Sequence, residues 1–169
     1  VKDNIISDNL WHGFSVSSGT AIVMNCAIGG NRSSGVHADS GIATVTNCTV
    51  NSNSEDGIFV SASGTAIVTN CTISGNTYGT DVYDGTATIS NSIVTFNGTG
   101  IRRTSTGYSL TLSYNDVYGN TTANYSNITD PTGTNGNISV DPLLSNPYRD
   151  IHIQPGSPCR DAGNDALVQ

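Results

Sequence analysis

Short runs of alternating apolar and polar residues follow one another along most of the chain, separated by Gly, Ser, Thr and Asn. Alternation puts every second side chain on one face, as in strands that bury a single face. Three such runs recur in order: one after an Asn (48–50), one after a Gly (35–36) and one before the next Asn (43–45). Because no helical periodicity accompanies them, the pattern predicts an all-β chain of many short strands.

These runs belong to a repeat of about 22 residues with the frame Asn-x-x-Ile/Val-x-x-Asn. Copies of the frame, the first and last of them looser, begin at Asp3, Asn25, Asn47, Asn70, Asn91 and Tyr114. The starts are 22, 22, 23, 21 and 23 residues apart. A period of this length fits one coil of a solenoid, in which equivalent residues stack about 4.8 Å apart. The sequence therefore predicts a single-stranded parallel β-helix (β-solenoid) of about six coils, with three short strands per coil.

The leading Asn of each frame lies where the third strand of one coil turns into the first strand of the next. Side-chain amides stacked at this corner donate and accept hydrogen bonds along the solenoid, so we expect an asparagine ladder. We expect these Asn side chains to be buried. For that reason we do not interpret triplets such as Asn47-Cys48-Thr49 as glycosylation sites.

Three cysteines, Cys26, Cys48 and Cys71, each follow a leading Asn, and Ser92 takes this position in the next coil. We expect a buried column in which cysteine acts as a small apolar residue. Neighbouring coils also bring such residues within disulfide range, so the sequence leaves their redox state open. A single column without a nearby His offers poor tetrahedral geometry for a metal.

The repeat divides the chain into three segments of one domain. We assign residues 1–120 to the coils, 121–140 to an irregular Thr/Asn/Gly-rich loop, and 141–169 to a C-terminal closing segment. We expect the closing segment to cover the open end of the core, where strand edges would otherwise be unpaired. The first coil has no equivalent cap, so we expect either a piece of a larger protein or an end that a second copy covers.

The net charge of the chain limits the classes of partner that it could bind. The formal net charge is -7, the pI is about 4.4, and Lys2 is the only lysine. Nucleic-acid binding needs clustered cations, so the sequence argues against a nucleic-acid partner. No apolar run approaches the roughly 20 residues of a membrane span, so we expect no membrane insertion.

The repeats over residues 3–120, with the tail segments Asp141-Pro142-Leu143-Leu144 and Pro155-Gly156-Ser157-Pro158, resemble bacterial extracellular right-handed parallel β-helix proteins. That superfamily contains pectate-lyase-like enzymes. The resemblance implies a right-handed helix and an extracellular or cell-surface location in bacteria. It implies no particular activity, because the group includes lyases, hydrolases, epimerases and binding proteins.

The second strand of each coil carries the most varied outward side chains, two and four residues beyond its Gly. They form two columns: Ser15/Ser17, His37/Asp39, Phe59/Ser61, Asp81/Tyr83 and Arg102/Thr104. Aromatic rings stack on the apolar faces of sugars, and planar polar groups hydrogen-bond their hydroxyls. The candidate polysaccharide-binding residues are therefore His37, Asp39, Phe59, Asp81, Tyr83 and Arg102.

The same face contains residue types used in catalysis. A lyase needs a base, often helped by Ca²⁺ or Arg, and Arg102, Asp81 and His37 are of suitable types. A glycosidase needs two carboxylates, and Asp39 and Asp81 stand two coils, or about 10 Å, apart. Because the paired-Asp and Gly-His-Gly signatures of polygalacturonases are missing, we assign no catalytic residue and favour a protein without its own chemistry.

We expect no cofactor, with Ca²⁺ as the only one considered. Glu55, Asp56 and Asp84 would supply oxygen ligands at turns, although no calcium-loop consensus is present.

The third strand presents a different exterior. Of its fifteen outward positions, from Thr20 to Ser113, eight are Thr and none is charged. Such a regular array resembles the ice-binding faces of β-solenoid antifreeze proteins, and it would also suit contact with a second copy.

We therefore expect an extracellular β-helix protein that contacts polysaccharide through the outer face of its second strands. Three alternatives stay open: a pectate-lyase-like depolymerase, a structural or self-associating module, and ice binding through the Thr-rich face.

Overall fold

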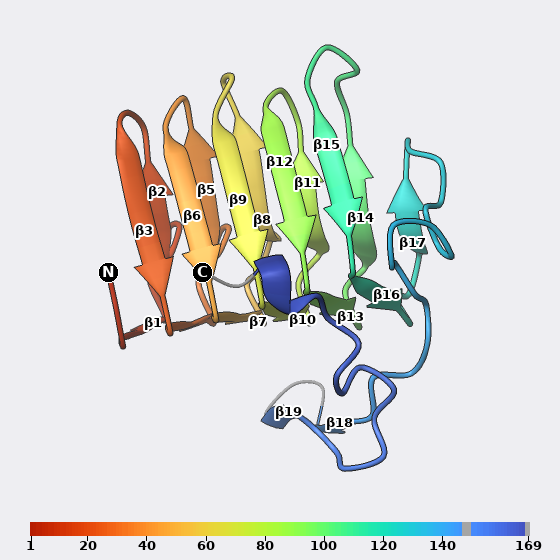
Figure 1. Ribbon diagram of the computed structural model, residues 1–169. Helices are drawn as coiled ribbons and strands as arrows, with labels where there is room; N and C mark the ends of the chain where they lie inside the picture. The colour runs from red at the N-terminus through yellow and green to blue at the C-terminus, as the bar shows by residue number, and fades with distance from the viewer. Residues whose placement is uncertain (147–149, 168–169) are drawn as a thin grey trace.

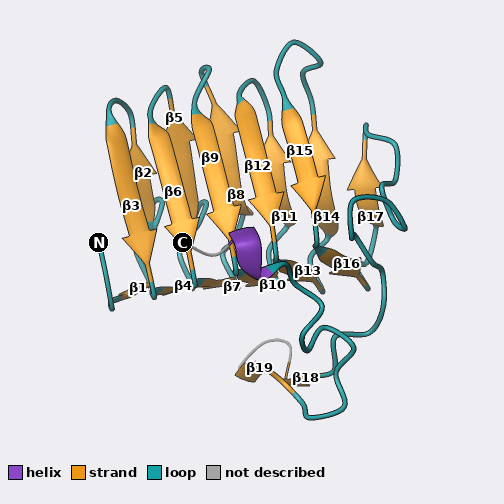
Figure 2. Cartoon of the chain, in the orientation of Figure 1, coloured by secondary structure: helices purple, strands orange, loops and turns teal. Residues whose placement is uncertain are grey.

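The chain folds into a β-solenoid whose coils stack along one axis (Figure 1). The computed structural model describes residues 1–146 and 150–167. Each full coil contributes one strand to each of three parallel sheets, and equivalent strands of successive coils are paired (Figure 2). The predicted all-β fold, with about six coils and three short strands per coil, is confirmed.

The three sheets correspond to the three runs of the repeat. Sheet 1 contains β1 (Ile5–Ser7), β4 (Ala27–Gly29), β7 (Thr49–Asn51), β10 (Thr72–Ser74), β13 (Ile93–Thr95) and β16 (Asp116–Tyr118). Sheet 2 contains β2 (Phe14–Val16), β5 (Val36–Asp39), β8 (Asp56–Ser61), β11 (Tyr78–Val82), β14 (Thr99–Arg103) and β17 (Ala123–Ser126). Sheet 3 contains β3 (Thr20–Met24), β6 (Ile42–Thr46), β9 (Thr65–Thr69), β12 (Thr86–Ser90) and β15 (Leu110–Ser113).

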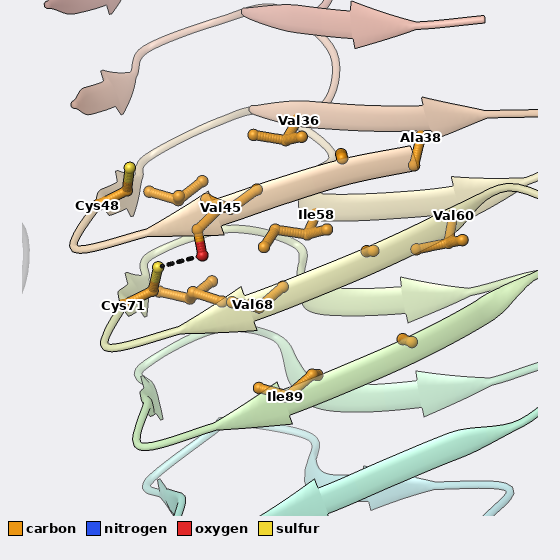
Figure 3. Close-up of a cluster of buried hydrophobic side chains, with 14 of the residues drawn as sticks. Val36, Ala38, Val45, Cys48, Ile58, Val60, Val68, Cys71 and Ile89 are labelled. Atoms are coloured by element: carbon orange, nitrogen blue, oxygen red, sulfur yellow. Dashed lines mark hydrogen bonds between the residues drawn. The ribbon is translucent and has the colours of Figure 1, made fainter. Parts of the chain in front are cut away.

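The core is a set of apolar columns that run along the inside of the three sheets (Figure 3). Val36 and Ile58 are register partners in sheet 2, and Val45 and Val68 are register partners in sheet 3. All four are fully buried. Burying a side chain of this size contributes about 1.5–3 kcal/mol. Because the alternation is maintained from coil to coil, the outward side chains also fall into fixed columns.

A ladder of asparagines runs along the corner between sheets 1 and 2, formed by the last Asn of each frame and by Asn124 of β17. Each side-chain amide nitrogen donates to the next side-chain oxygen at 2.8–3.0 Å, in the order Asn9, Asn31, Asn53, Asn76, Asn97, Asn120 and Asn124. The amide of Asn76 also donates to the main-chain oxygens of Val50 and Ser74. Its middle members are buried and fully hydrogen-bonded, so we call this the inner ladder.

The leading Asn residues form a second, outer ladder, and the expectation that they are buried is wrong. Asn25 and Asn47 are exposed, while Asn70 is half-buried. Their side chains are joined along the stack at 3.4 Å and 3.2 Å. All three have φ near +53°, in the left-handed region that Asn tolerates better than most residues. Backbone geometry at the corner therefore explains these asparagines, and burial gives no argument against glycosylation at Asn47.

The predicted cysteine column is present. Cys26, Cys48 and Cys71 are buried between the sheets, and the Cys71 thiol donates to the main-chain oxygen of Val45 at 3.5 Å (Figure 3). Ser92 continues the column, and its hydroxyl accepts a hydrogen bond from the Cys71 backbone. The four cysteines are free thiols, so the disulfide that the spacing left open is not formed in this structure.

The segment 121–140 is more regular than the irregular loop we expected. It contains β17, which pairs with β14 as the last strand of sheet 2. Ile138 forms a bridge with Asp116, and Ile128 packs against the core. These contacts show that this segment, not the tail, covers the C-terminal end of the core. Composition concealed the strand because Asn and Ser, which are typical of turns, make up half of it.

The tail instead lies along the outside of sheet 1. It contains the hairpin of β18 (Leu144–Asn146) and β19 (Asp150–Ile153) and the 3₁₀ turn η1 (Asp165–Leu167). Asn91 and Asn164 exchange two hydrogen bonds, at 3.0 Å and 2.9 Å, which fix the tail to the outer ladder. Residues 147–149 and 168–169 of the predicted closing segment lie outside the described residues. Among the helices of the described chain, none is long and apolar enough to span a membrane.

The N-terminal end of the solenoid is formed by β1, β2 and β3, the outermost strands of their sheets. Ile5 and Leu10 of this first coil are 81% and 71% exposed, which is high for apolar side chains. Contact with a second copy at this end stays a prediction.

Candidate functional site

An open groove of about 550 Å³ lies over the outer face of sheet 2 and the turns that lead into it. We call it the sheet 2 groove. Its lining residues come from coils one to five: Trp11, His12, Ser33, His37, Ser54, Glu55, Asp56, Phe59, Thr77, Tyr78, Asp81, Tyr83 and Arg102. The groove therefore runs across successive coils, with a few side chains from each.

Strand register brings the predicted residues together. His37 pairs with Phe59, Phe59 with Asp81, and Asp81 with Arg102 in adjacent strands. With Tyr83, these are five of the six candidates, and all five line the groove. Asp39 pairs with Ser61 and is not among the lining residues. The groove therefore includes the first of the two predicted columns, but from the second column it includes Tyr83 and not Asp39.

Aromatic and imidazole rings form a row along the groove. Adjacent ring centroids are 6.4 Å apart from Trp11 to His12, 4.5 Å from His12 to His37, 4.9 Å from His37 to Phe59 and 6.4 Å from Phe59 to Tyr83. The His37 and Phe59 rings are stacked. Trp11 is 75% exposed and Tyr83 is 51% exposed, so both ends of the row offer ring surface to a ligand.

Arg102 and Asp81 are bound to each other at the far end of the row. The guanidinium donates from Nε to Asp81 Oδ1 at 3.0 Å and from Nη2 to Oδ2 at 2.5 Å. Its Cζ lies 3.7 Å from the centroid of the Tyr78 ring. The Asp81 side chain is 3% exposed and that of Arg102 is 29% exposed. This bidentate pair anchors Arg102 against the sheet and satisfies a buried carboxylate.

A second carboxyl, Asp56, is buried beneath the groove. It accepts a hydrogen bond from the Ser34 hydroxyl at 3.2 Å. Burial, with a smaller effect from the Asp81 charge, raises the pKa of Asp56 from 3.8 to about 7. The neighbouring Glu55 is exposed at the rim, where it accepts a hydrogen bond from the Ser33 hydroxyl. Asp56 can thus carry a proton near neutral pH, whereas its neighbour faces solvent.

The two groove histidines are shifted toward their neutral forms. Burial lowers the pKa of His12, although Glu55 and Asp39 oppose this effect. Burial also lowers the pKa of His37, and the nearby His12 lowers it further. His37 Nε2 shares a hydrogen bond of 2.8 Å with the Ser61 hydroxyl. At neutral pH the pair therefore adds aromatic surface and hydrogen-bonding capacity, with little positive charge.

Several groove residues were missed by sequence reasoning. Tyr78 and Asp56 are register partners at the start of β11 and β8, just before the Gly of each coil. Counting outward positions only after the Gly left them out. Asp56 was interpreted as a turn residue and a calcium ligand, yet it begins a strand. His12 holds the same place in the first coil, and Trp11 lies one residue earlier, so counting the two positions before the Gly would have found all four.

The residues considered as calcium ligands do not form a cluster. Asp56 lies at the beginning of β8, whereas Asp84 follows the end of β11 and accepts a hydrogen bond from the Ala62 backbone at 2.5 Å. Within residues 1–146 and 150–167, no group of three or more His, Cys, Asp or Glu is arranged to hold a metal ion.

Asp56→Asn should change how stability depends on pH. Between pH 4 and pH 8 the unfolded chain releases the Asp56 proton first, so wild-type stability falls as pH rises. We expect Asp56→Asn to be about 4 kcal/mol more stable than the wild type at pH 8 and nearly equal at pH 4. Urea unfolding at both pH values measures this difference.

Thr77→Val is the matched control, because Thr77 lines the same groove and the change alters no titratable group. It should keep the wild-type pH dependence. An Asp56→Asn variant with the same pH dependence as the wild type would show that Asp56 ionises in the ordinary range.

The Thr-rich outer face of sheet 3 has the expected columns. One of them pairs Ile22, Thr44, Ile67, Thr88 and Thr111 without a break in register. Ile22 is 54% exposed and Ile67 is 39% exposed. Ice binding or contact with a second copy through this face stays a prediction.

Comparison with known proteins identifies the family. The model of the right handed beta helix region matches residues 1–140, so the chain belongs to this family. The match confirms the right-handed parallel β-helix and covers the entire sheet 2 groove. No curated protein and no solved structure matches the chain.

Proposed function

We propose that this protein is an extracellular right-handed β-helix that binds a polysaccharide along the sheet 2 groove. The observation that carries the proposal is the row of rings from Trp11 to Tyr83, which follows the stacking direction of the coils. Coils repeat about every 4.8 Å, close to the length of one sugar unit in an extended polymer. A linear polymer lying in the groove would therefore meet similar contacts at each coil.

Binding is better supported than cleavage. A lyase acting on a uronate needs a cation for the substrate carboxylate and a base to remove a proton. Arg102 is the only Lys or Arg among the described residues that line the groove, and Asp81 already holds it. This pairing leaves Arg102 few donors for a substrate carboxylate and keeps Asp81 buried. The groove therefore favours recognition of sugar rings over the chemistry of a pectate-lyase-like depolymerase.

A depletion assay against insoluble and gelled polysaccharides tests the proposal. We expect the wild type to bind at least one polymer and Phe59→Ala to bind it roughly tenfold more weakly, because losing a stacked ring costs about 1.4 kcal/mol. Phe59 is a better residue to replace than Asp81. Asp81 is buried and ion-paired, so replacing Asp81 would also disturb the fold.

Ile67→Ala is the matched control. Ile67 also projects outward from the third coil, but from sheet 3. This variant should bind like the wild type, and both variants should keep the wild-type circular dichroism spectrum. The proposal is wrong if the wild type depletes no polymer, or if Ile67→Ala weakens binding as much as Phe59→Ala.

A further inference from the structure

We infer that the sheet 2 groove is specific for a polymer of basic amino sugars, and that the Glu55 carboxylate at its rim rejects uronic acid polymers. The inference rests on the proposed function, since it names the class of sugar that the same groove would take. It depends on the balance of charges in the groove and on the ring surface beside them.

Carboxyl groups outnumber free cations along the groove. Glu55, Asp56 and Asp81 all line it, and they come from coils three and four. Asp81 is paired with Arg102 and Asp56 is largely protonated at pH 6, so Glu55 supplies the carboxylate that a ligand meets. Glu55 is exposed at the rim, close to the part of a ligand that remains in solvent. A protonated amine placed there would gain a charge-assisted hydrogen bond, whereas a uronate would meet a like charge.

The cation that could neutralise the negative charge in the groove is already ion-paired. Arg102 donates two hydrogen bonds to Asp81, and Tyr78 covers one face of its guanidinium. Such a bidentate pair leaves few donors for a second carboxylate. The lowered pKa values of His12 and His37 keep both rings largely uncharged at neutral pH. A uronate entering the described groove thus finds no unpaired positive charge.

The rings favour a cation as well. An ammonium group over an aromatic face is attracted by the electron density of the ring, and Trp and Tyr are good partners for this contact. Trp11 and Tyr83 offer such faces, and the half-buried Phe59 lies between them in the row. The net charge of -7 adds a long-range attraction for cationic polymers, which salt would screen.

Two glucosamine hexamers that differ only in acetylation isolate the role of the amine, and oligogalacturonates test the rejection of a carboxylate. The probes are β-1,4-linked glucosamine hexamers, the same hexamers with every amine acetylated, and oligogalacturonates, tested by calorimetry at pH 6. We expect the free-amine hexamer to bind at least tenfold more tightly than the acetylated one, and oligogalacturonate to show no binding.

Glu55→Gln should weaken binding of the free-amine hexamer by about fivefold and leave binding of the acetylated hexamer unchanged. Asp165→Asn is the matched control, because it makes the same charge change in the exposed η1 turn, away from the groove. It should bind both hexamers like the wild type.

The outcomes separate this inference from the proposed function. Tighter binding of the acetylated hexamer or of oligogalacturonate would overturn the inference, while the groove would remain a sugar site. Equal weakening by Glu55→Gln and Asp165→Asn would also overturn it, because net charge alone would explain the attraction. If none of these sugars binds and the polysaccharide panel is also negative, the proposed function itself fails.

Discussion

Replacing Asn76 by alanine should lower the free energy of unfolding by about 4 kcal/mol, because the inner ladder would lose a buried member. The Asn76 amide donates to Val50 and Ser74 main-chain oxygens and to the Asn97 side chain. Its Oδ1 accepts from the backbone and the side chain of Asn53. Each buried group left without a partner costs about 1 kcal/mol or more, and no solvent reaches this corner to replace Asn76.

Asn70→Gly is the control that separates the inner ladder from the outer one. Asn70 belongs to the same coil and donates to Asn47 at 3.2 Å, but it is half-buried and has a φ of 54°. Glycine keeps this left-handed conformation, so we expect a loss below about 1 kcal/mol. Urea unfolding of both variants measures the difference. Similar losses would mean that burial of the ladder contributes little to stability.

The period and the alternation of the sequence were enough to predict the coils and the core. Alternation determines which residues face inward, and the repeat length determines which residues share a column. The positions of Val45, Val68 and Cys48 follow from these two regularities alone. The same reasoning predicted that His37, Phe59, Asp81 and Arg102 would share an outward column, which the strand register reproduces.

What the pattern could not provide was the corner geometry. Asn47 and Asn53 begin and end the same frame, yet one is exposed with positive φ and the other is buried in a ladder. The distinction depends on how sharply the backbone turns at each corner, and a one-dimensional repeat does not contain this information. The same limitation concealed Asp56 and Tyr78, which begin β8 and β11 next to this corner and complete the groove.

The tail could not be placed from sequence for a different reason. Its position depends on contacts over long sequence separation, such as that between Asn91 and Asn164. The C-terminal end of the core was already covered by β17 and Ile128, so the tail lies on sheet 1 instead. There the Cys159 thiol donates to Asp116 at 2.9 Å.

Gly57→Ala should destabilise the protein by about 3 kcal/mol and also weaken polysaccharide binding in the sheet 2 groove. A Cβ at Gly57 would lie 2.6 Å from the main-chain oxygen of Gly79 and 2.6 Å from Ile73 Cγ2. It would also lie 3.0 Å from the Asn76 amide nitrogen of the inner ladder. The Gly79 oxygen cannot move away without breaking the pairing of β8 and β11. The steric clash therefore cannot be relieved by a small local shift.

The effect of Gly57→Ala should extend to the groove because Gly57 lies in β8 between Asp56 and Phe59. Displacing β8 outward would separate the rings and shift the buried carboxyl. Thermal unfolding and polysaccharide depletion would therefore show losses together. Gly107→Ala is the control, since its nearest neighbour would be Ser105 Oγ at 3.8 Å, and it should stay within about 0.5 kcal/mol of the wild type. A Gly57→Ala variant as stable as the wild type would mean that the coils can separate locally, and the groove would then be less rigid than its register suggests.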